Sequence, residues 1–321
     1  MTLLVAMAND SIAVVVADRR LTRGQTVLDE EFNKVTVLFC RDAKLTVAFT
    51  GLATFGNFNT SEWLAETLFD ICDHSLDVHS VIAELVVRAG KQFSLLAAND
   101  RRLTIILCGF VYWSGTPEQR IYVISNFEHG NYSPGSFTTV SSGSTGQSLV
   151  EVRGQSKALP ERTLASLRSL LERAVPHASL VRFAVRHLQN AANNVKSLNG
   201  IGEHCNAAVV RSGVDTLVTA TYHTTKNAQR AYGPNVVVAK TMICLGYEVM
   251  APSIVAGPEI RKQDPCWCGS GDRFKHCHMK KYGGIYVQDS AWTKPLIPFV
   301  RGRNDEGWPS GRVFSVWAGY E

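Results

Sequence analysis

The stretch TLLVAMANDSIAVVVADRRLTRG, residues 2–24, decides the fold of this chain. An apolar run, Leu3–Ala8, is followed by the polar pair Asn9-Asp10 and by a second apolar run, Ile12–Ala17, in an expected strand that ends at Asp18. Two such runs joined by a short polar turn are typical of a β-hairpin. The polar interruption and the missing basic segment argue against a secretory signal peptide. The sequence therefore predicts a structural hairpin, and we expect a soluble, cytoplasmic protein.

Beyond this hairpin, the expected strands and helices come in blocks. Strands precede two amphipathic helices, more strands follow, and a second helix pair precedes the last two strands. A doubly wound parallel sheet would instead alternate single helices with strands. The order favours an α+β fold with two sheets face to face and helices on both outer sides. The expected strands are Lys34–Arg41, Lys44–Thr50, Leu103–Trp113, Ile121–Phe127, Phe137–Ser141, Ala207–Arg211 and Thr216–Tyr222, and the expected helices are Ser61–Asp73, Val78–Leu96, Glu161–Ala174 and Leu180–Asn193.

The composition excludes several classes of protein. The chain has 321 residues, 45% of them hydrophobic and 19% charged, with 33 Lys+Arg against 28 Asp+Glu. This length allows one large domain or two smaller ones. A net charge of +5 without blocks of like charge is weak support for a nucleic-acid partner, and we expect none. No apolar run reaches the roughly 18–20 residues that span a bilayer, so we expect no membrane association.

The character of the sequence changes near residue 245. Pro252, Gly257 and Pro258 suggest a linker, and a cysteine cluster and a segment rich in Gly, Pro and aromatic residues follow it. The aromatic tail either packs back on the main domain, which we favour, or lines a groove for a partner. The expected divisions are a main domain at 1–245, a linker at 246–261, a metal-binding motif at 262–282 and the tail at 283–321.

The cysteine cluster has the spacing of a metal site. In DPCWCGSGDRFKHCH, residues 264–278, Cys266 and Cys268 are separated by one residue, and the adjacent pair Cys277 and His278 follows. Clustered thiols in a reducing compartment indicate a metal before a disulfide. Four such ligands suit tetrahedral Zn²⁺ with no open position, which predicts a structural role. His276 competes with His278 as the fourth ligand, and the spacing favours His278.

This stretch closely resembles the SEC-C motif, a short zinc-binding segment with the pattern Asp-Pro-Cys-x-Cys-Gly-Ser-Gly and a final Cys-Cys or Cys-His. All four ligand positions are present, and Trp267 stands where the family often has Pro. The resemblance implies an interaction knob that docks onto a partner protein or the ribosome.

The second residue of the chain has its own chemical interest. Removal of Met1 would leave Thr2 with a free α-amine beside its hydroxyl, which combines a nucleophile and a general base in one residue. The segment ADRRLTRG, residues 17–24, and Lys34, sixteen residues after Asp18, follow at fixed spacing. Together they resemble the proteasome β-type subunits, a branch of the N-terminal-nucleophile hydrolases.

That resemblance implies a four-layer αββα sandwich and a threonine protease or amidase acting on a peptide or protein substrate. Thr2 would be the nucleophile, Lys34 would lower its effective pKa, and Asp18 would hold Lys34 charged and aligned. Gly51 would supply the oxyanion N–H, and Ser142 would support the terminal amine. Such subunits usually assemble into rings, so a homo-oligomer is expected.

One part of the family pattern is missing. The Asp-x-x-Ser-Gly element that orients the amine is replaced by Gly200-Ile201-Gly202-Glu203-His204-Cys205-Asn206, in which Glu203 or Asn206 is a substitute. This departure leaves an alternative from another class: an inactive scaffold of the same fold that binds proteins through its zinc motif. The intact set of Thr2, Asp18 and Lys34 favours the enzyme.

Overall fold

The structure is a computed structural model of the whole chain. It describes residues 2–30, 32–40, 42–71, 77–112, 116–128, 130, 132–143, 146–194, 200–213, 218–224, 230–232, 235–238, 241–244, 246–248, 263, 273, 276, 299–301 and 314–320.

The first of two large sheets is built around the N-terminal hairpin. It has the strand order β12-β1-β2-β13-β14-β20, in which all neighbours are antiparallel except the parallel pair β14 and β20. The hairpin that the sequence predicts is present, with Val5 opposite Val16. The strands are β1 (Leu3–Ala8), β2 (Ile12–Asp18), β12 (Leu149–Gly154), β13 (Cys205–Arg211), β14 (Val218–Thr224) and β20 (Phe314–Tyr320).

The second sheet has eight strands in the order β11-β10-β9-β6-β5-β16-β17-β19. Its strands are β5 (Val35–Cys40), β6 (Ala43–Gly51), β9 (Leu103–Val111), β10 (Glu118–Ser125), β11 (Thr138–Ser142), β16 (Asn235–Val238), β17 (Thr241–Cys244) and β19 (Phe299–Arg301). Three short pairs lie outside both sheets: β3 (Leu21–Arg23) with β4 (Thr26–Asp29), β7 (Thr54–Phe55) with β8 (Phe58–Asn59), and β15 (Arg230–Tyr232) with β18 (Gly246–Glu248).

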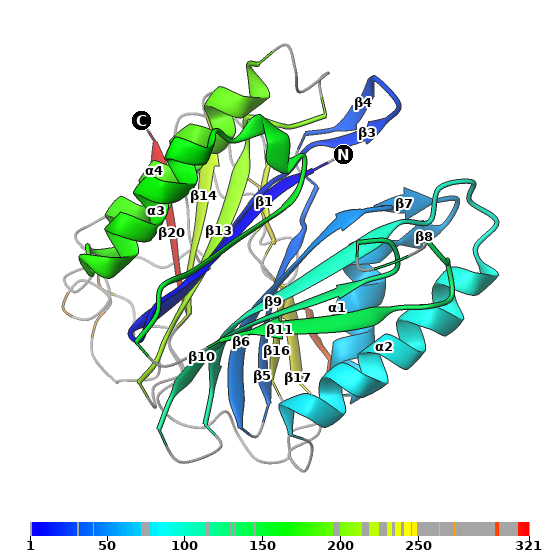
Figure 1. Cartoon of the computed structure of the whole chain (residues 1–321), viewed down its shortest axis with the longest axis horizontal. Helices are drawn as coiled ribbons and strands as arrows, with labels where there is room; N and C mark the ends of the chain where they lie inside the picture. Colours follow the sequence, from blue (N-terminus) through cyan, green and yellow to red (C-terminus); the bar gives the residue numbers. More distant parts are fainter. Residues whose placement is uncertain are drawn as a thin grey trace.

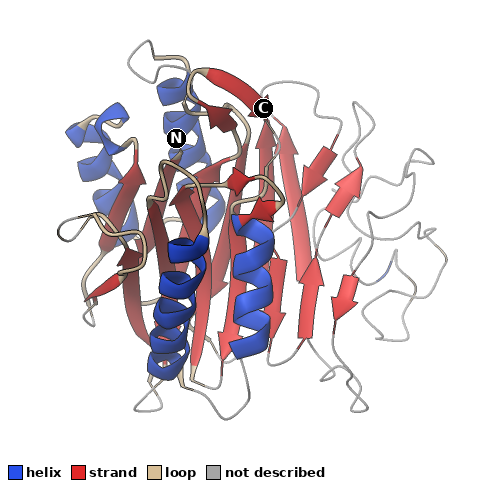
Figure 2. Cartoon of the chain, turned by 90° about the vertical axis from the view of Figure 1, so that its right-hand side faces the viewer, coloured by secondary structure: helices blue, strands red, loops and turns tan. Residues whose placement is uncertain are grey.

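Four α-helices cover the outer faces of the sheets. They are α1 (Thr60–Ile71) and α2 (Val78–Leu95) beside the eight-stranded sheet, and α3 (Glu161–Glu172) and α4 (His177–Ala192) beside the six-stranded one, with a short 3-10 turn η1 (Ser156–Ala158) before α3. Figures 1 and 2 show each helix pair on the outside of its own sheet. The chain is therefore a mixed α/β protein.

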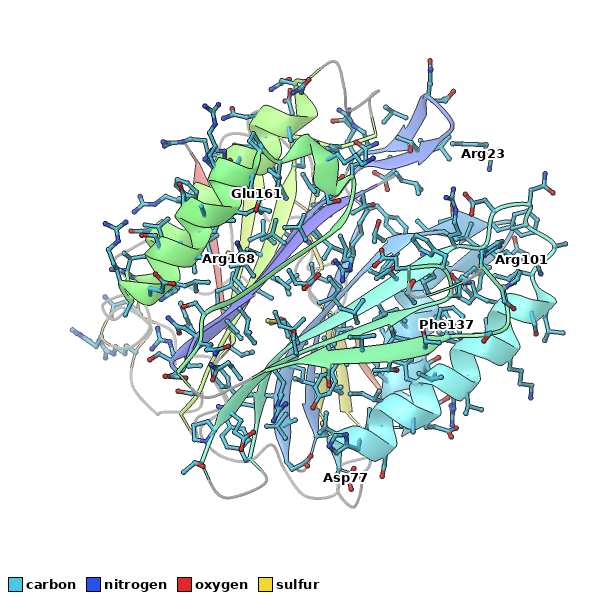
Figure 3. All side chains as sticks on the ribbon, viewed as in Figure 1. Arg23, Asp77, Arg101, Phe137, Glu161 and Arg168 are labelled. Atoms are coloured by element: carbon cyan, nitrogen blue, oxygen red, sulfur yellow. The ribbon has the colours of Figure 1, made fainter. Side chains whose placement is uncertain are left out.

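The alternation of side chains along the strands explains why both faces of each sheet are buried. In β1, Leu4, Ala6 and Ala8 face the other sheet, whereas Leu3, Val5 and Met7 pack towards α3 and α4. This is the two-residue period of a strand with a core on each side. On the opposite side of the molecule, Phe137 contacts Phe93 of α2 with ring centroids 5.6 Å apart (Figure 3).

The sequence missed several strands. β12 was not expected because its Glu151 and Arg153 interrupt the apolar pattern; these two side chains form an ion pair, and Arg153 also pairs with Glu128 at 2.6 Å. The pairs β3–β4 and β7–β8 were also missed, since their strands are short and none of their residues is fully buried. β18 falls within residues 246–261, and β19 and β20 within 283–321, while the expected domain boundaries stay predictions.

The helices of the described part are all too short or too polar to cross a lipid bilayer.

Candidate active site

Thr2 lies immediately before β1, at the end of the six-stranded sheet, and is buried with 4% exposure. Its carbonyl oxygen accepts a hydrogen bond of 2.9 Å from the backbone N–H of Gln155. The next residue, Leu3, donates its backbone N–H to Asp18 Oδ1 at 2.7 Å. The main chain is therefore held on both sides of the Thr2 side chain. Figure 1 shows this end of β1 at the same end of the molecule as the β3–β4 hairpin.

Asp18 is the last residue of β2 and is fully buried. Besides the Leu3 N–H on Oδ1, its Oδ2 accepts from the backbone N–H groups of Arg20 and Gly202, each at 3.0 Å. The ammonium group of Lys34 lies 3.2 Å from the same oxygen. A buried carboxylate needs such donors because it has lost its hydration.

Lys34 directly precedes β5, and its side chain is 1% exposed. Its Nζ donates to Asp18 and also to the carbonyl oxygen of Arg20, at 2.7 Å. Burial lowers the pKa of the Lys34 ammonium group below its ordinary value, and the Asp18 carboxylate partly opposes this shift. The structure thus brings Asp18 and Lys34 together, and it joins both to the residue after Thr2.

Gly154, the last residue of β12, lies between Thr2 and the end of β6. Gly154 has φ +83°, and a Cβ atom there would lie 1.8 Å from the Thr2 carbonyl oxygen and 2.9 Å from the hydroxyl oxygen of Thr50. Thr50 is buried, and Gly51 follows it with φ +114°. Gly51, the expected oxyanion residue, therefore directly follows a threonine whose hydroxyl lies beside Gly154, the glycine that packs on the Thr2 carbonyl.

Ser142 does not join the site. It ends β11 and pairs with Ile121, whereas the Gly51 end of the same sheet meets the other end of β11 through β9 and β10. The following loop confirms this position, since Gly146 donates to Asp10 in the turn between β1 and β2. That turn lies at the far end of β1 from Thr2. The Ser-Gly step in the sequence gave no information about which end of the sheet it occupies.

The two expected substitutes for the missing amine-orienting element lie beside the site. The Asn206 side chain bonds to Arg19 at 3.4 Å and to Asn33 at 3.3 Å. The carbonyl oxygen of Glu203 accepts from Gln189 at 3.2 Å. The nearby Cys205 thiol is fully buried, and burial raises its pKa.

Two site features were absent from the sequence interpretation. Gly202 supplies an N–H to Asp18, and a Cβ atom on Gly202 would lie 2.7 Å from Arg20 Cβ, so only glycine fits. Gly154 is needed for the close approach to Thr2. A glycine in a loop or at a strand end is the only sequence signal for either role, and it is too common to identify them.

The predicted zinc ligands, Cys266, Cys268, Cys277 and His278, lie outside the described residues. Within the described part of the chain, no three His, Cys, Asp or Glu side chains gather in a group that would hold a metal ion. The donor set nevertheless fits zinc chemically, because two thiolates, a third thiolate and an imidazole fill a tetrahedral shell.

Comparison with known proteins adds two findings. Residues 264–280 match the family model of the SEC-C motif, which confirms that part of the sequence prediction. Among solved structures, Anbu (ancestral beta-subunit) from Yersinia bercovieri is similar to this chain, at 16% identity, with 65% of this chain and 82% of that chain covered and a TM-score of 0.40. A similarity at this level identifies neither the family nor the activity of the chain.

Proposed function

We propose that the chain is a threonine-type hydrolase of peptide or other amide bonds, with an N-terminal-nucleophile fold of four αββα layers. One observation supports this proposal above all. A single buried carboxylate, Asp18, holds the main chain directly after Thr2 through Oδ1 and the Lys34 ammonium group through Oδ2. A structural ion pair at a strand end would not require a link to residue 3.

In the proposed reaction, Met1 has been removed and Thr2 carries a free α-amine. The amine takes the proton of the Thr2 hydroxyl as its Oγ attacks the carbonyl carbon of the substrate. The positive charge of Lys34 favours the developing alkoxide, and the Gly51 N–H is the candidate donor to the oxyanion. The C–N bond then breaks, the proton passes to the leaving amine, and water hydrolyses the ester on Thr2.

The experiment combines a mass measurement with two variants. We expect the intact mass of the untagged chain to be short by one methionine and the chain to hydrolyse a fluorogenic tripeptide amide. Thr2→Ala should abolish hydrolysis, whereas Thr2→Ser, which keeps a hydroxyl, should retain part of it. A peptide epoxyketone should react with the wild type and with Thr2→Ser but not with Thr2→Ala, since its adduct needs both a hydroxyl and an amine at residue 2. Retention of Met1 in a chain without hydrolytic activity would contradict the mechanism and leave a protein-binding scaffold. Wild-type activity in Thr2→Ala would show that Thr2 is not the nucleophile.

We also propose that the SEC-C segment binds one structural Zn²⁺ through Cys266, Cys268, Cys277 and His278. When bound, the ion would fix the fold of this short segment, and it would take no part in amide hydrolysis. The segment would then recruit a substrate, a partner protein or the ribosome to the hydrolase. Assembly of the hydrolase into a homo-oligomeric ring and a cytoplasmic location belong to the same proposal.

A further inference from the structure

Arg20 contacts both Lys34 and its counter-ion Asp18 through its main chain. Its carbonyl oxygen accepts from Lys34 Nζ at 2.7 Å, and its backbone N–H donates to Asp18 Oδ2 at 3.0 Å. Asp18 in turn binds the Lys34 ammonium group. Any shift of the Arg20 main chain would therefore move both groups that locate the ammonium charge.

The side chain of Arg20 is held by a carboxylate outside the site described above. Arg20 Nη2 lies 2.9 Å from Glu30 Oε1, and the two side chains are 11% and 34% exposed. The other oxygen of Glu30, Oε2, lies 3.5 Å from Nε2 of His204, whose side chain is 6% exposed. Glu30 thus bridges two largely buried side chains with separate oxygens.

His204 also contacts the main chain directly after Asp18. Its carbonyl oxygen accepts the backbone N–H of Arg19 at 2.9 Å. Gly202, two residues earlier, donates to Asp18 and packs directly on the Arg20 main chain. The loop at residues 202–204 and Glu30 therefore both contact the segment between Asp18 and Leu21.

We propose that Glu30 and His204 are positioning residues for Lys34, which act by fixing Arg20. This inference rests on the proposed hydrolase function. Neither side chain is required to touch the substrate, and neither matches the family pattern that the sequence resembles. A charged group that is displaced by about 1 Å can cost a large part of the rate, because the reaction depends on its position.

The test compares Glu30→Ala with Glu30→Gln in the full-length chain. Alanine removes the bridge, whereas glutamine keeps an acceptor for Arg20. We expect kcat on the fluorogenic tripeptide amide to fall about tenfold in Glu30→Ala with KM unchanged. Glu30→Gln should stay within about threefold of wild type. If Glu30→Ala does not fold, Arg20→Met removes the same contact and carries the same expectation.

The matched control is Glu118→Ala. Glu118 forms an ion pair with Arg120 at 2.8 Å, with exposure similar to that of Glu30, at the far end of the eight-stranded sheet. It should leave kcat and KM unchanged. An equal loss of kcat in Glu118→Ala would attribute the effect to general destabilisation and overturn the proposal.

A readout independent of hydrolysis separates this inference from the proposed function. In ¹⁵N-lysine-labelled protein, the Lys34 ammonium signal should titrate differently in Glu30→Ala and as in wild type in Glu118→Ala. Such a change in a chain that hydrolyses nothing would support the positioning role and refute the hydrolase. An unchanged Lys34 titration together with unchanged kcat in Glu30→Ala would overturn the positioning role.

Discussion

Lys34 Nζ and Asp18 Oδ2 lie 3.2 Å apart, with side-chain exposures of 1% and 0%. A charge pair this deeply buried is costly to form, because both ions lose their hydration. It is held by additional donors and acceptors from Leu3, Arg20 and Gly202. The buried pair therefore fixes the position of the positive charge on Lys34, and we infer that this function offsets the cost of burying it.

The first prediction concerns the charge balance of this pair. Asp18→Asn leaves the Lys34 ammonium group buried without its counter-ion, so the free energy of unfolding should fall by about 3–5 kcal/mol. Adding Lys34→Met removes the unpaired charge, so the double variant should be more stable than Asp18→Asn alone. Urea unfolding measures both, and neither variant should hydrolyse the peptide amide. A double variant less stable than Asp18→Asn would contradict the prediction.

The second prediction is a pH profile. The proposed role needs Lys34 protonated, so the rate should fall as the pH rises through its pKa. Because burial lowers that pKa, the alkaline limb should begin below the value of about 10.4 typical of lysine. Measurement of kcat/KM against pH, with folding checked at each point, tests this. Glu118→Gln should keep the limb in place, and a profile that stays flat up to the ordinary lysine pKa would count against the charged role of Lys34.

The third prediction separates a steric clash from backbone strain. Gly154 and Gly146 have nearly the same φ, +83° and +81°, but a Cβ atom meets the Thr2 carbonyl oxygen only at Gly154. Alanine at either position should lower the free energy of unfolding by about 1–2 kcal/mol, because an L-residue is strained in the left-handed backbone conformation. Gly154→Ala should lose more stability than Gly146→Ala in thermal unfolding, and its kcat should fall at least about tenfold because Thr2 is displaced. Equal effects of the two substitutions on stability and kcat would show that a side chain at residue 154 does not displace Thr2.

The fourth prediction concerns the metal. Elemental analysis of the purified chain should find about one zinc per molecule, as a four-ligand structural site requires. Cys266→Ser should lose the zinc, whereas Cys40→Ser, outside the motif, should keep it. Amide hydrolysis by the main domain should persist without the metal. A metal-free wild type that is fully folded at residues 264–280 would refute the zinc proposal.

The sequence predicted those parts of the fold that depend on residues close together in the chain. The N-terminal hairpin followed from two apolar runs around Asn9-Asp10, and the pairing of Asp18 with Lys34 was implied by the resemblance of residues 2–34 to the proteasome β-type subunits. Strand β12 was missed because its charged side chains are satisfied by ion pairs that only the folded chain forms.

The remainder of the site depends on contacts between distant segments. Gly202 reaches Asp18 across 184 positions of sequence, and no local pattern specifies that approach. Ser142 was misplaced for the same reason, since its position along the sheet is set by strand register and not by its neighbours. The placement of Glu30 and His204 around Arg20 is likewise a property of the folded loops.

The hydrogen bond between Gly202 and Asp18 affects when the site can form during synthesis of the chain. Asp18 and Lys34 leave the ribosome well before Gly202, whose N–H donor is synthesised 184 residues after Asp18. At bacterial or eukaryotic rates of synthesis, that interval is on the order of 10–40 s. During it, the carboxylate lacks one of its donors and the Lys34 charge has no enclosed position. In a nascent chain, Thr2 would therefore lack the completed Asp18–Lys34 arrangement. The proposed hydrolase would become active only after most of its fold had formed.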